Sequence, residues 1–195
     1  AIFVALLTPW ITRNYLHFDK IIPVKSNLLF DAYQANYRKN NGLVTRTTFD
    51  HHPYVELLRT SNSEYKTMGE NKFLEEYKSR FLTAMKKDPL TFLRKIKNRF
   101  FASTLVYFPY DIYVETDYNG WKNVLHPLPF ICLCWLLFAF KRGLPIEISL
   151  AAVIYAVFLL PYIVFSYYVR YAIPLTPLKA LFVFWVFDRL ILKKE

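Results

Sequence analysis

Two arginines have the residue type and the position needed to bind a phosphate group at a membrane surface. Arg13 follows a short hydrophobic stretch in the run TPWITRN, and Arg170 follows a long uncharged stretch in the run YYVRY. A guanidinium group stays charged and offers paired N–H donors that match two phosphate oxygens. An arginine at a helix end also serves as a simple anchor to ordinary lipid phosphates. Position alone leaves both interpretations open.

The motifs of soluble enzymes are absent from the sequence. Its four glycines lie far apart, so there is no Gly-rich phosphate loop, and neither HExxH nor paired CxxC motifs occur. His51 and His52 are neighbours whose rings diverge in most backbones, which favours a surface loop over a metal site. We therefore expect these residues to require no metal and no cofactor.

The last third of the chain contains three hydrophobic stretches, at about 124–140, 147–169 and 173–192. Ile148 to Val169 carries no charged residue, which meets the need for roughly 20 apolar residues to cross a bilayer. A soluble core can hold one such stretch, but three in succession indicate a polytopic, all-α membrane protein. Lys179 lies inside the third stretch, where it either reaches outward to the interface or faces an internal polar cavity.

Charge supports a membrane setting and predicts an orientation. The 195 residues are 54% hydrophobic and 19% aromatic, with a net charge of +10. Anionic lipid explains this positive charge better than nucleic acid does, because the basic residues extend through a segment between hydrophobic stretches. Lys141 and Arg142 follow the first stretch and Lys193 and Lys194 follow the third, so we expect these ends in the cytoplasm of a bacterial inner membrane.

This orientation divides the chain into three parts. Residues 1–9 are expected to end an outgoing transmembrane helix that stops at Pro9, which suits the C-terminal part of a longer polytopic protein. Residues 10–122 would form an extracytoplasmic segment, with a surface loop over 45–67 and helices at about 70–87 and 89–105. Residues 123–195 would hold the three transmembrane helices.

The two helices expected in the middle segment have different faces. Phe73, Tyr77, Phe81 and Met85 recur at helical spacing in the first. Glu76 and Arg80 stand four apart, as in an ion pair on one helix face. Further sequence signals are Asp88 as an N-cap and Pro89 at the first position of the second helix.

The second helix is basic and amphipathic. Leu93, Ile96 and Phe100 share one face, and the basic residues occupy the rest; these are Arg94, Lys95, Lys97 and Arg99. This pattern predicts a juxtamembrane helix lying on the bilayer surface. An ordinary solvated helix packed on its own domain is the alternative.

The order of three motifs resembles the C-terminal half of bacterial GT-C membrane glycosyltransferases, in particular the protein O-mannosyltransferase and aminoarabinose transferase superfamily. The motifs are Pro9-Trp10-x-x-Arg13-Asn14, the helices from Gly69-Glu70 to Asp88-Pro89, and Arg170-Tyr171-x-x-Pro174. The resemblance covers nearly the whole chain. Each motif is weak alone, and their order together with their membrane placement carries the resemblance. The chain has Ala35-Asn36 where relatives often have Gly-Asn, and Lys179 is unusual for the last span.

The resemblance implies an inverting transfer of sugar from a polyprenyl-phosphate donor to an extracytoplasmic acceptor, which would be a protein, a glycolipid or a polysaccharide. The general-base carboxylate would lie in an earlier loop outside this chain, so no catalytic residue is expected here. Arg13 and Arg170 would contact the departing phosphate, with Asn14 and Tyr171 as weaker candidates. Two alternatives stay open: a non-catalytic membrane assembly or receptor protein, and a transporter or polymerase that handles a lipid carrier.

Overall fold

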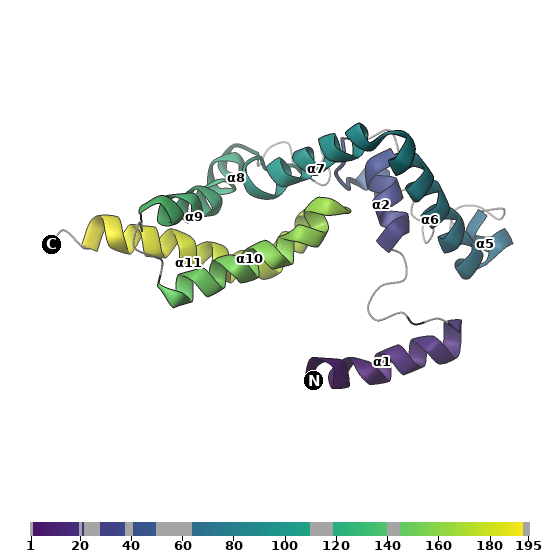
Figure 1. Cartoon of the computed structure of the whole chain (residues 1–195). Helices are drawn as coiled ribbons and strands as arrows, with labels where there is room; N and C mark the ends of the chain where they lie inside the picture. Colours follow the sequence, from purple (N-terminus) through teal and green to yellow (C-terminus); the bar gives the residue numbers. More distant parts are fainter. Residues whose placement is uncertain are drawn as a thin grey trace.

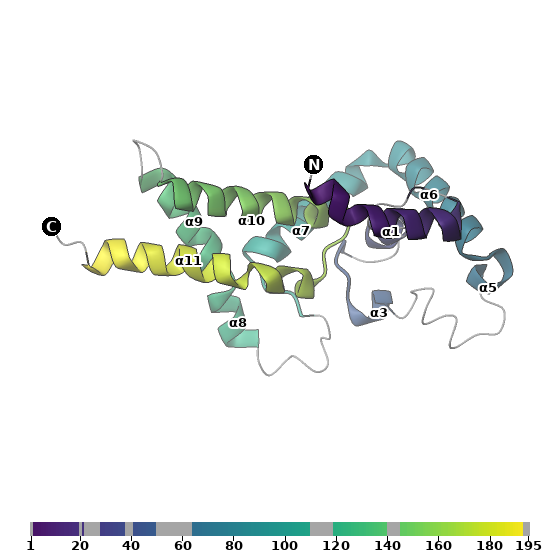
Figure 2. The same cartoon turned by 90° about the horizontal axis from the view of Figure 1, so that it is seen from below.

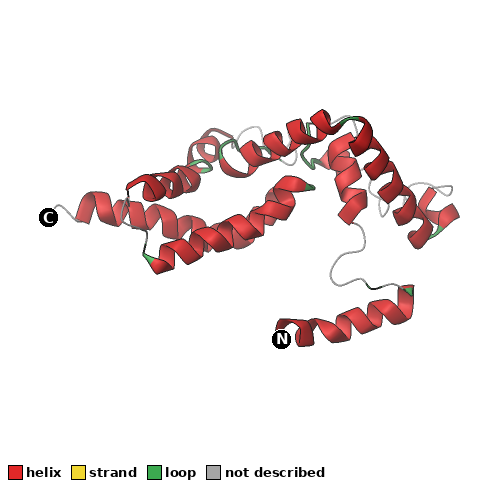
Figure 3. Cartoon of the chain, viewed as in Figure 1, coloured by secondary structure: helices red, strands yellow, loops and turns green. Residues whose placement is uncertain are grey.

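A computed structural model describes residues 2–19, 21, 28–37, 41–49, 64–109, 119–139 and 145–192. Within these ranges the chain is mostly helical and forms no strand, and Leu43 and Tyr167 make one isolated parallel bridge (Figure 3). The predicted all-α class is therefore confirmed for the described part of the chain.

The helices follow one another along the described parts of the chain (Figure 1). Their bounds are α1 (Ile2–Phe18), α2 (Leu28–Tyr37), α3 (Arg46–Phe49), α5 (Glu64–Met68), α6 (Glu70–Lys87), α7 (Pro89–Thr104), α8 (Asn119–Leu125), α9 (Leu128–Ala139), α10 (Ile146–Val164), η2 (Val169–Leu175), α11 (Thr176–Phe187) and η3 (Asp188–Leu192). The segment η2 is a 3-10 helix, and η3 is a short π-helical turn that continues α11.

Among the described residues, three helical stretches are long and apolar enough to cross a membrane: Gly120–Ala139, Ile146–Val164 and Val169–Leu190. These are the three stretches that hydrophobicity predicted, with shifted ends. The first begins earlier because α8 and α9 follow each other with only a turn between them. The second ends at Val164, several residues before the first charge at Arg170. In Figures 1 and 2, α9, α10 and α11 lie side by side.

The core between α9, α10 and α11 is apolar. Leu136, Ile148 and Phe182 are completely buried there, and Tyr155 of α10 makes an edge-on ring contact with Phe182. The opposite faces of the same helices are exposed and equally apolar. The sequence of each helix explains this, since it is hydrophobic all round and has no polar stripe to turn toward water.

The break between α6 and α7 lies where the sequence predicted it. The Asp88 carboxylate accepts a hydrogen bond from the Thr91 N–H at 3.0 Å, and Pro89 occupies the first turn of α7. Arg80 Nε donates to Glu76 at 2.9 Å, which confirms the expected pair. Both features are local, so sequence spacing alone determines them.

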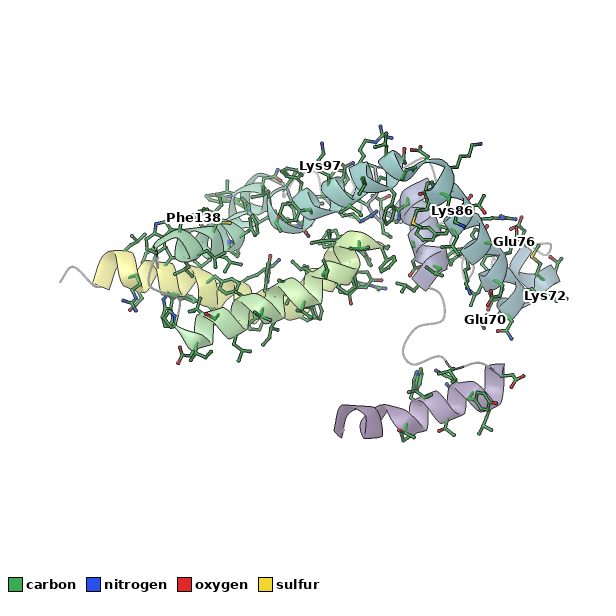
Figure 4. The ribbon with its side chains drawn as sticks, in the orientation of Figure 1. Glu70, Lys72, Glu76, Lys86, Lys97 and Phe138 are labelled. Carbon is green, nitrogen blue, oxygen red and sulfur yellow. The ribbon has the colours of Figure 1, made fainter. Side chains whose placement is uncertain are left out.

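The aromatic face of α6 packs on α2. Phe73, Tyr77 and Phe81 are buried, and Phe30 of α2 contacts the first two of these rings. In Figure 1 α2 lies against α6 near the corner where α6 meets α7, whereas α1 lies apart from both. Along α6, the opposite face is charged and carries Glu76, which Figure 4 labels.

Two expectations for the first 67 residues were wrong. The first helix does not stop at Pro9, because α1 continues through it to Phe18. A proline removes a single N–H donor, and the hydrogen bonds on either side can continue the helix. The expected loop over 45–67 forms a short helix at each end, α3 and α5, and residues 50–63 lie outside the described residues. His51 and His52 lie outside the described residues.

The expected exposure of the basic residues on α7 is also wrong for two of them. Arg99 is completely buried and Lys95 is 6% exposed, although both were assigned to the outer, polar side of the helix. Lys97 does lie outside, pointing away from α10 (Figure 4). Leu93 and Phe100 are exposed on their face of the helix.

Candidate functional site

The buried Arg99 joins three parts of the chain that are far apart in sequence. Its Nε donates to the Ile163 carbonyl at 2.6 Å and its Nη2 to the Val164 carbonyl at 2.7 Å. Its Nη1 donates to Asn36 Oδ1 at 3.0 Å and, at 3.4 Å, to the Gly42 carbonyl. The guanidinium group therefore connects α7, the end of α10, α2 and the segment after α2.

The end of α10 explains why an arginine is buried here. The last carbonyls of a helix have no partner within the helix, and they form the negative end of its dipole. Arg99 supplies the donors for Ile163 and Val164 together with a positive charge. Burial lowers the pKa of Arg99 to about 10, so the group is still charged at neutral pH.

Asn36 completes this network from the other side. Its side-chain nitrogen donates to the Ala32 carbonyl at 2.7 Å and to the Phe165 carbonyl at 3.2 Å, while its oxygen accepts from Arg99. Asn36 is completely buried. The amide thus binds the chain directly after α10, which extends the cap that Arg99 places on that helix.

The segment after α2 is held against α7 and then against the chain that leaves α10. Asn98 donates to the Asn41 carbonyl at 2.8 Å, and Gly42 packs so closely on Lys95 that a Cβ there would lie 2.9 Å from the Lys95 Cβ. The Val44 N–H then donates to the Tyr167 carbonyl at 3.0 Å. Burial lowers the pKa of Lys95 to about 8, with the charges of Arg99 and Arg94 adding to the effect.

These contacts position the short connection between α10 and α11, which carries Arg170. The Arg170 guanidinium lies 4.6 Å from the Tyr168 ring centre and 5.9 Å from that of Tyr171. Tyr171 in turn stacks on Tyr162 with 4.5 Å between ring centres. Arg170 itself is exposed, and within the described residues it makes no ion pair with a carboxylate.

The other two candidates from the sequence lie on α1. Arg13 is exposed and its guanidinium lies 5.3 Å from the Trp10 ring centre, whereas Asn14 is buried. The described contacts bring Tyr171 to Arg170, but they give no direct interaction between Arg13 and Arg170. The roles of all four residues at a phosphate stay predictions.

An exposed guanidinium beside tyrosine rings can bind an anion while the rings contact a sugar ring. The arginine keeps its N–H donors for a phosphate, while aromatic faces offer apolar area to a sugar ring. Among the described residues no group of three His, Cys, Asp or Glu side chains could hold a metal ion.

Sequence reasoning missed Arg99 and assigned no role to Asn36. Spacing suggested that Arg99 is one more solvated cation on a basic helix. The sequence contained one weak signal, the Ala35-Asn36 pair. The structure buries both of these residues. Their role depends on their contact with the end of α10, which lies more than 60 residues beyond Arg99 in the chain. No local sequence pattern reveals this contact.

Comparison with known proteins gives no relative. No family model, no curated protein and no solved structure matches the chain. The resemblance to membrane glycosyltransferases therefore rests on the motifs of the sequence alone.

Proposed function

We propose that this chain is part of an integral membrane protein that binds a lipid-linked phosphate, and that the intact protein transfers a sugar from a polyprenyl-phosphate donor to an acceptor outside the cytoplasm. Membrane insertion is supported by the outer faces of the apolar helices. Val153, Val157 and Leu160 of α10 are 58%, 64% and 59% exposed, and Phe184 of α11 is 71% exposed. Lipid would cover this surface, which water solvates poorly.

In this proposal α7 lies along the bilayer surface. Leu90, Leu93 and Phe101 are 75%, 57% and 42% exposed, and they would enter the boundary between head groups and acyl chains. Arg94 and Lys97 are exposed as well and would contact anionic head groups. Residues 10–122 would then face the extracytoplasmic side of a bacterial inner membrane, and the C-terminus the cytoplasm.

The observation that carries the functional proposal is the setting of Arg170. It stands at the start of the third apolar stretch, exposed, near two tyrosine rings and without a carboxylate partner among the described residues. A permanent positive charge at that depth matches the phosphate of a lipid carrier, and the tyrosines would contact the sugar attached to it.

In the reaction, the acceptor oxygen attacks the sugar's anomeric carbon while the bond from that carbon to the phosphate oxygen breaks. The acceptor's proton passes to a carboxylate outside this chain, and the phosphate leaves on its lipid with an added negative charge. Arg170 would stabilise that developing charge through its N–H donors. Arg13 and Asn14 of α1, and Tyr171, are the further proposed contacts to the donor.

The test follows release of polyprenyl phosphate by the intact protein in nanodiscs, using a panel of labelled polyprenyl-phosphate sugars. We expect Arg170→Ala to lower turnover about 100-fold, the usual effect of removing one donor to a developing anion. Arg170→Lys should restore only part of the activity, because an ammonium lacks the paired geometry.

Arg94→Ala is the matched control, since Arg94 is an exposed arginine with one hydrogen bond, to Thr91, and no part in the proposed site. It should turn over like wild type. Full activity of Arg170→Ala would mean that Arg170 serves only as a membrane anchor. No release from any donor would reject the transferase and favour the carrier or assembly protein.

A further inference from the structure

A second basic cluster lies where α8 meets α9 and α11 begins. Lys122 comes from α8, His126 from the turn before α9, and Lys179 from the first turn of α11. The helices α9 and α11 pack along each other in one apolar core, which brings their first turns to the same end of the bundle (Figures 1 and 2). The cluster shares no residue with the proposed Arg170 site.

Tyr107, just beyond α7, holds two of the three basic groups together. Lys122 Nζ donates to the Tyr107 hydroxyl at 3.2 Å and lies 4.9 Å from the centre of its ring. The His126 ring meets the same tyrosine ring edge-on, with 5.8 Å between centres. His126 Nε2 lies 3.0 Å from the Ala102 carbonyl. Because a carbonyl only accepts, this nitrogen carries the proton, and Nδ1 points elsewhere.

Lys179 adds charge from the side of α11. It is partly buried and lies close enough to His126 for its charge to act on the ring. In the described part of the chain its ammonium has neither an ion pair nor a hydrogen bond. An ammonium inside an apolar stretch is costly, and pairing with an anion removes much of that cost.

A buried hydroxyl that has no partner among the described residues belongs to Tyr167, which lies close enough to Tyr107 for an electrostatic interaction. Tyr167 is 1% exposed, and its Oη has no hydrogen-bond partner within the described residues. Burial raises the pKa of Tyr167, with Tyr155 and Tyr107 near enough to add to the effect, so the phenol stays neutral and keeps a proton to donate. Buried polar groups usually have a partner, which makes this one a candidate donor to a bound group.

We infer that Lys122 and Lys179, both close to His126, form a second anion site, which binds a phosphate group, either on an anionic lipid or free in solution. Two lysines supply charge, and the neighbouring Tyr107 and Tyr167 supply hydroxyl donors. A phosphate diester of an anionic lipid would enter from the bilayer and balance the charge of Lys179, which has no carboxylate partner among the described residues. This site does not depend on the proposed sugar transfer.

The experiment uses the whole 195-residue chain in uncharged maltoside micelles. Short-chain phosphatidylglycerol, short-chain phosphatidylcholine and inorganic phosphate are titrated separately, and binding is followed by thermophoresis. We expect phosphatidylglycerol to bind, and Lys179→Gln to weaken it at least tenfold, or about 1.4 kcal/mol. Lys122→Gln should weaken it as well, and Lys72→Gln, at an exposed lysine of α6, should not.

Near-ultraviolet circular dichroism shows whether each variant stays folded. If Lys179→Gln does not fold, Lys122→Gln on α8 gives the same measurement. Inorganic phosphate that binds with the same dependence on Lys179 would identify free phosphate as the source and support the site. Equal binding of phosphatidylglycerol by wild type and all cluster variants, or equal binding of phosphatidylcholine, would overturn it.

Discussion

At the scale of single residues, the best-supported feature is the buried Arg99. A charged side chain without exposure is rare unless its donors are used, and Arg99 uses all three nitrogens on carbonyl or amide oxygens. The positive charge also lies at the negative end of α10. The same residue type therefore has two uses here: Arg99 stabilises the protein, and the exposed Arg170 is proposed to bind a ligand.

We predict that Arg99→Met destabilises the chain by about 3 kcal/mol, because the Ile163 and Val164 carbonyls and the Asn36 amide lose a charged partner. Arg99→Lys should recover little, since one ammonium cannot reach all three oxygens. Unfolding in mixed micelles with increasing SDS measures the effect. Arg94→Met is the control and should change stability by less than about 0.5 kcal/mol. A similar small change for Arg99→Met would mean that the network adds nothing.

At the scale of elements, α7 connects α2 and α6 to the three apolar helices. One side of it holds Arg99 and Lys95 against the protein, and the other exposes Leu93 and Phe100. The segment after α2 fits against the buried side only because Gly42 has no side chain and adopts φ +99°. Packing therefore decides which of the basic residues of α7 lie on its inner side and which on its outer side.

Three glycines test this packing. Gly42→Ala should cost about 1–3 kcal/mol, since the new Cβ would meet Lys95 at 2.9 Å and φ is positive. Gly69→Ala should cost less, because its φ of +74° is unfavourable but nothing lies within 4 Å. Gly120→Ala, in open space within α8, should be neutral or stabilising. Thermal unfolding in micelles gives the order, and equal effects at Gly42 and Gly120 would contradict the close contact.

At the scale of the whole molecule, the described chain has two parts: three packed apolar helices and a corner of α2, α6 and α7 that meets the end of α10 (Figure 1). The outer faces of the apolar helices include Phe138 on α9, which is 81% exposed (Figure 4). An exposed surface with this many aromatic and aliphatic side chains suits lipid as the surrounding solvent.

We predict that Val153→Arg, midway along α10, lowers membrane insertion by about 3 kcal/mol, the cost of an arginine near the centre of a spanning helix. Leu82→Arg on α6 is the control, because an exposed position in water tolerates the charge within about 0.5 kcal/mol. Both are compared by the fraction of protein that resists alkaline extraction from membranes. If both variants insert equally well, α10 does not face lipid at Val153.

The sequence by itself determined the features that depend on neighbours within a turn or a span. These include the three apolar stretches, the Asp88 cap with Pro89, and the aromatic face of α6, because hydrophobic length, capping and helical period act over short distances. The tyrosines beside Arg170 were also visible in the run YYVRY, although the stacking of Tyr171 on Tyr162 was not.

Only the tertiary structure decided which cations are buried and which are exposed. Arg99 and Lys97 look alike in sequence, yet one caps α10 and the other points outward. The difference arises from contacts between residues 57 to 65 positions apart, at Gly42, Asn36, Ile163 and Val164. Unpaired carbonyls at the end of a distant helix bind the Arg99 guanidinium and not the Lys97 ammonium, and a local sequence pattern does not show where that helix ends.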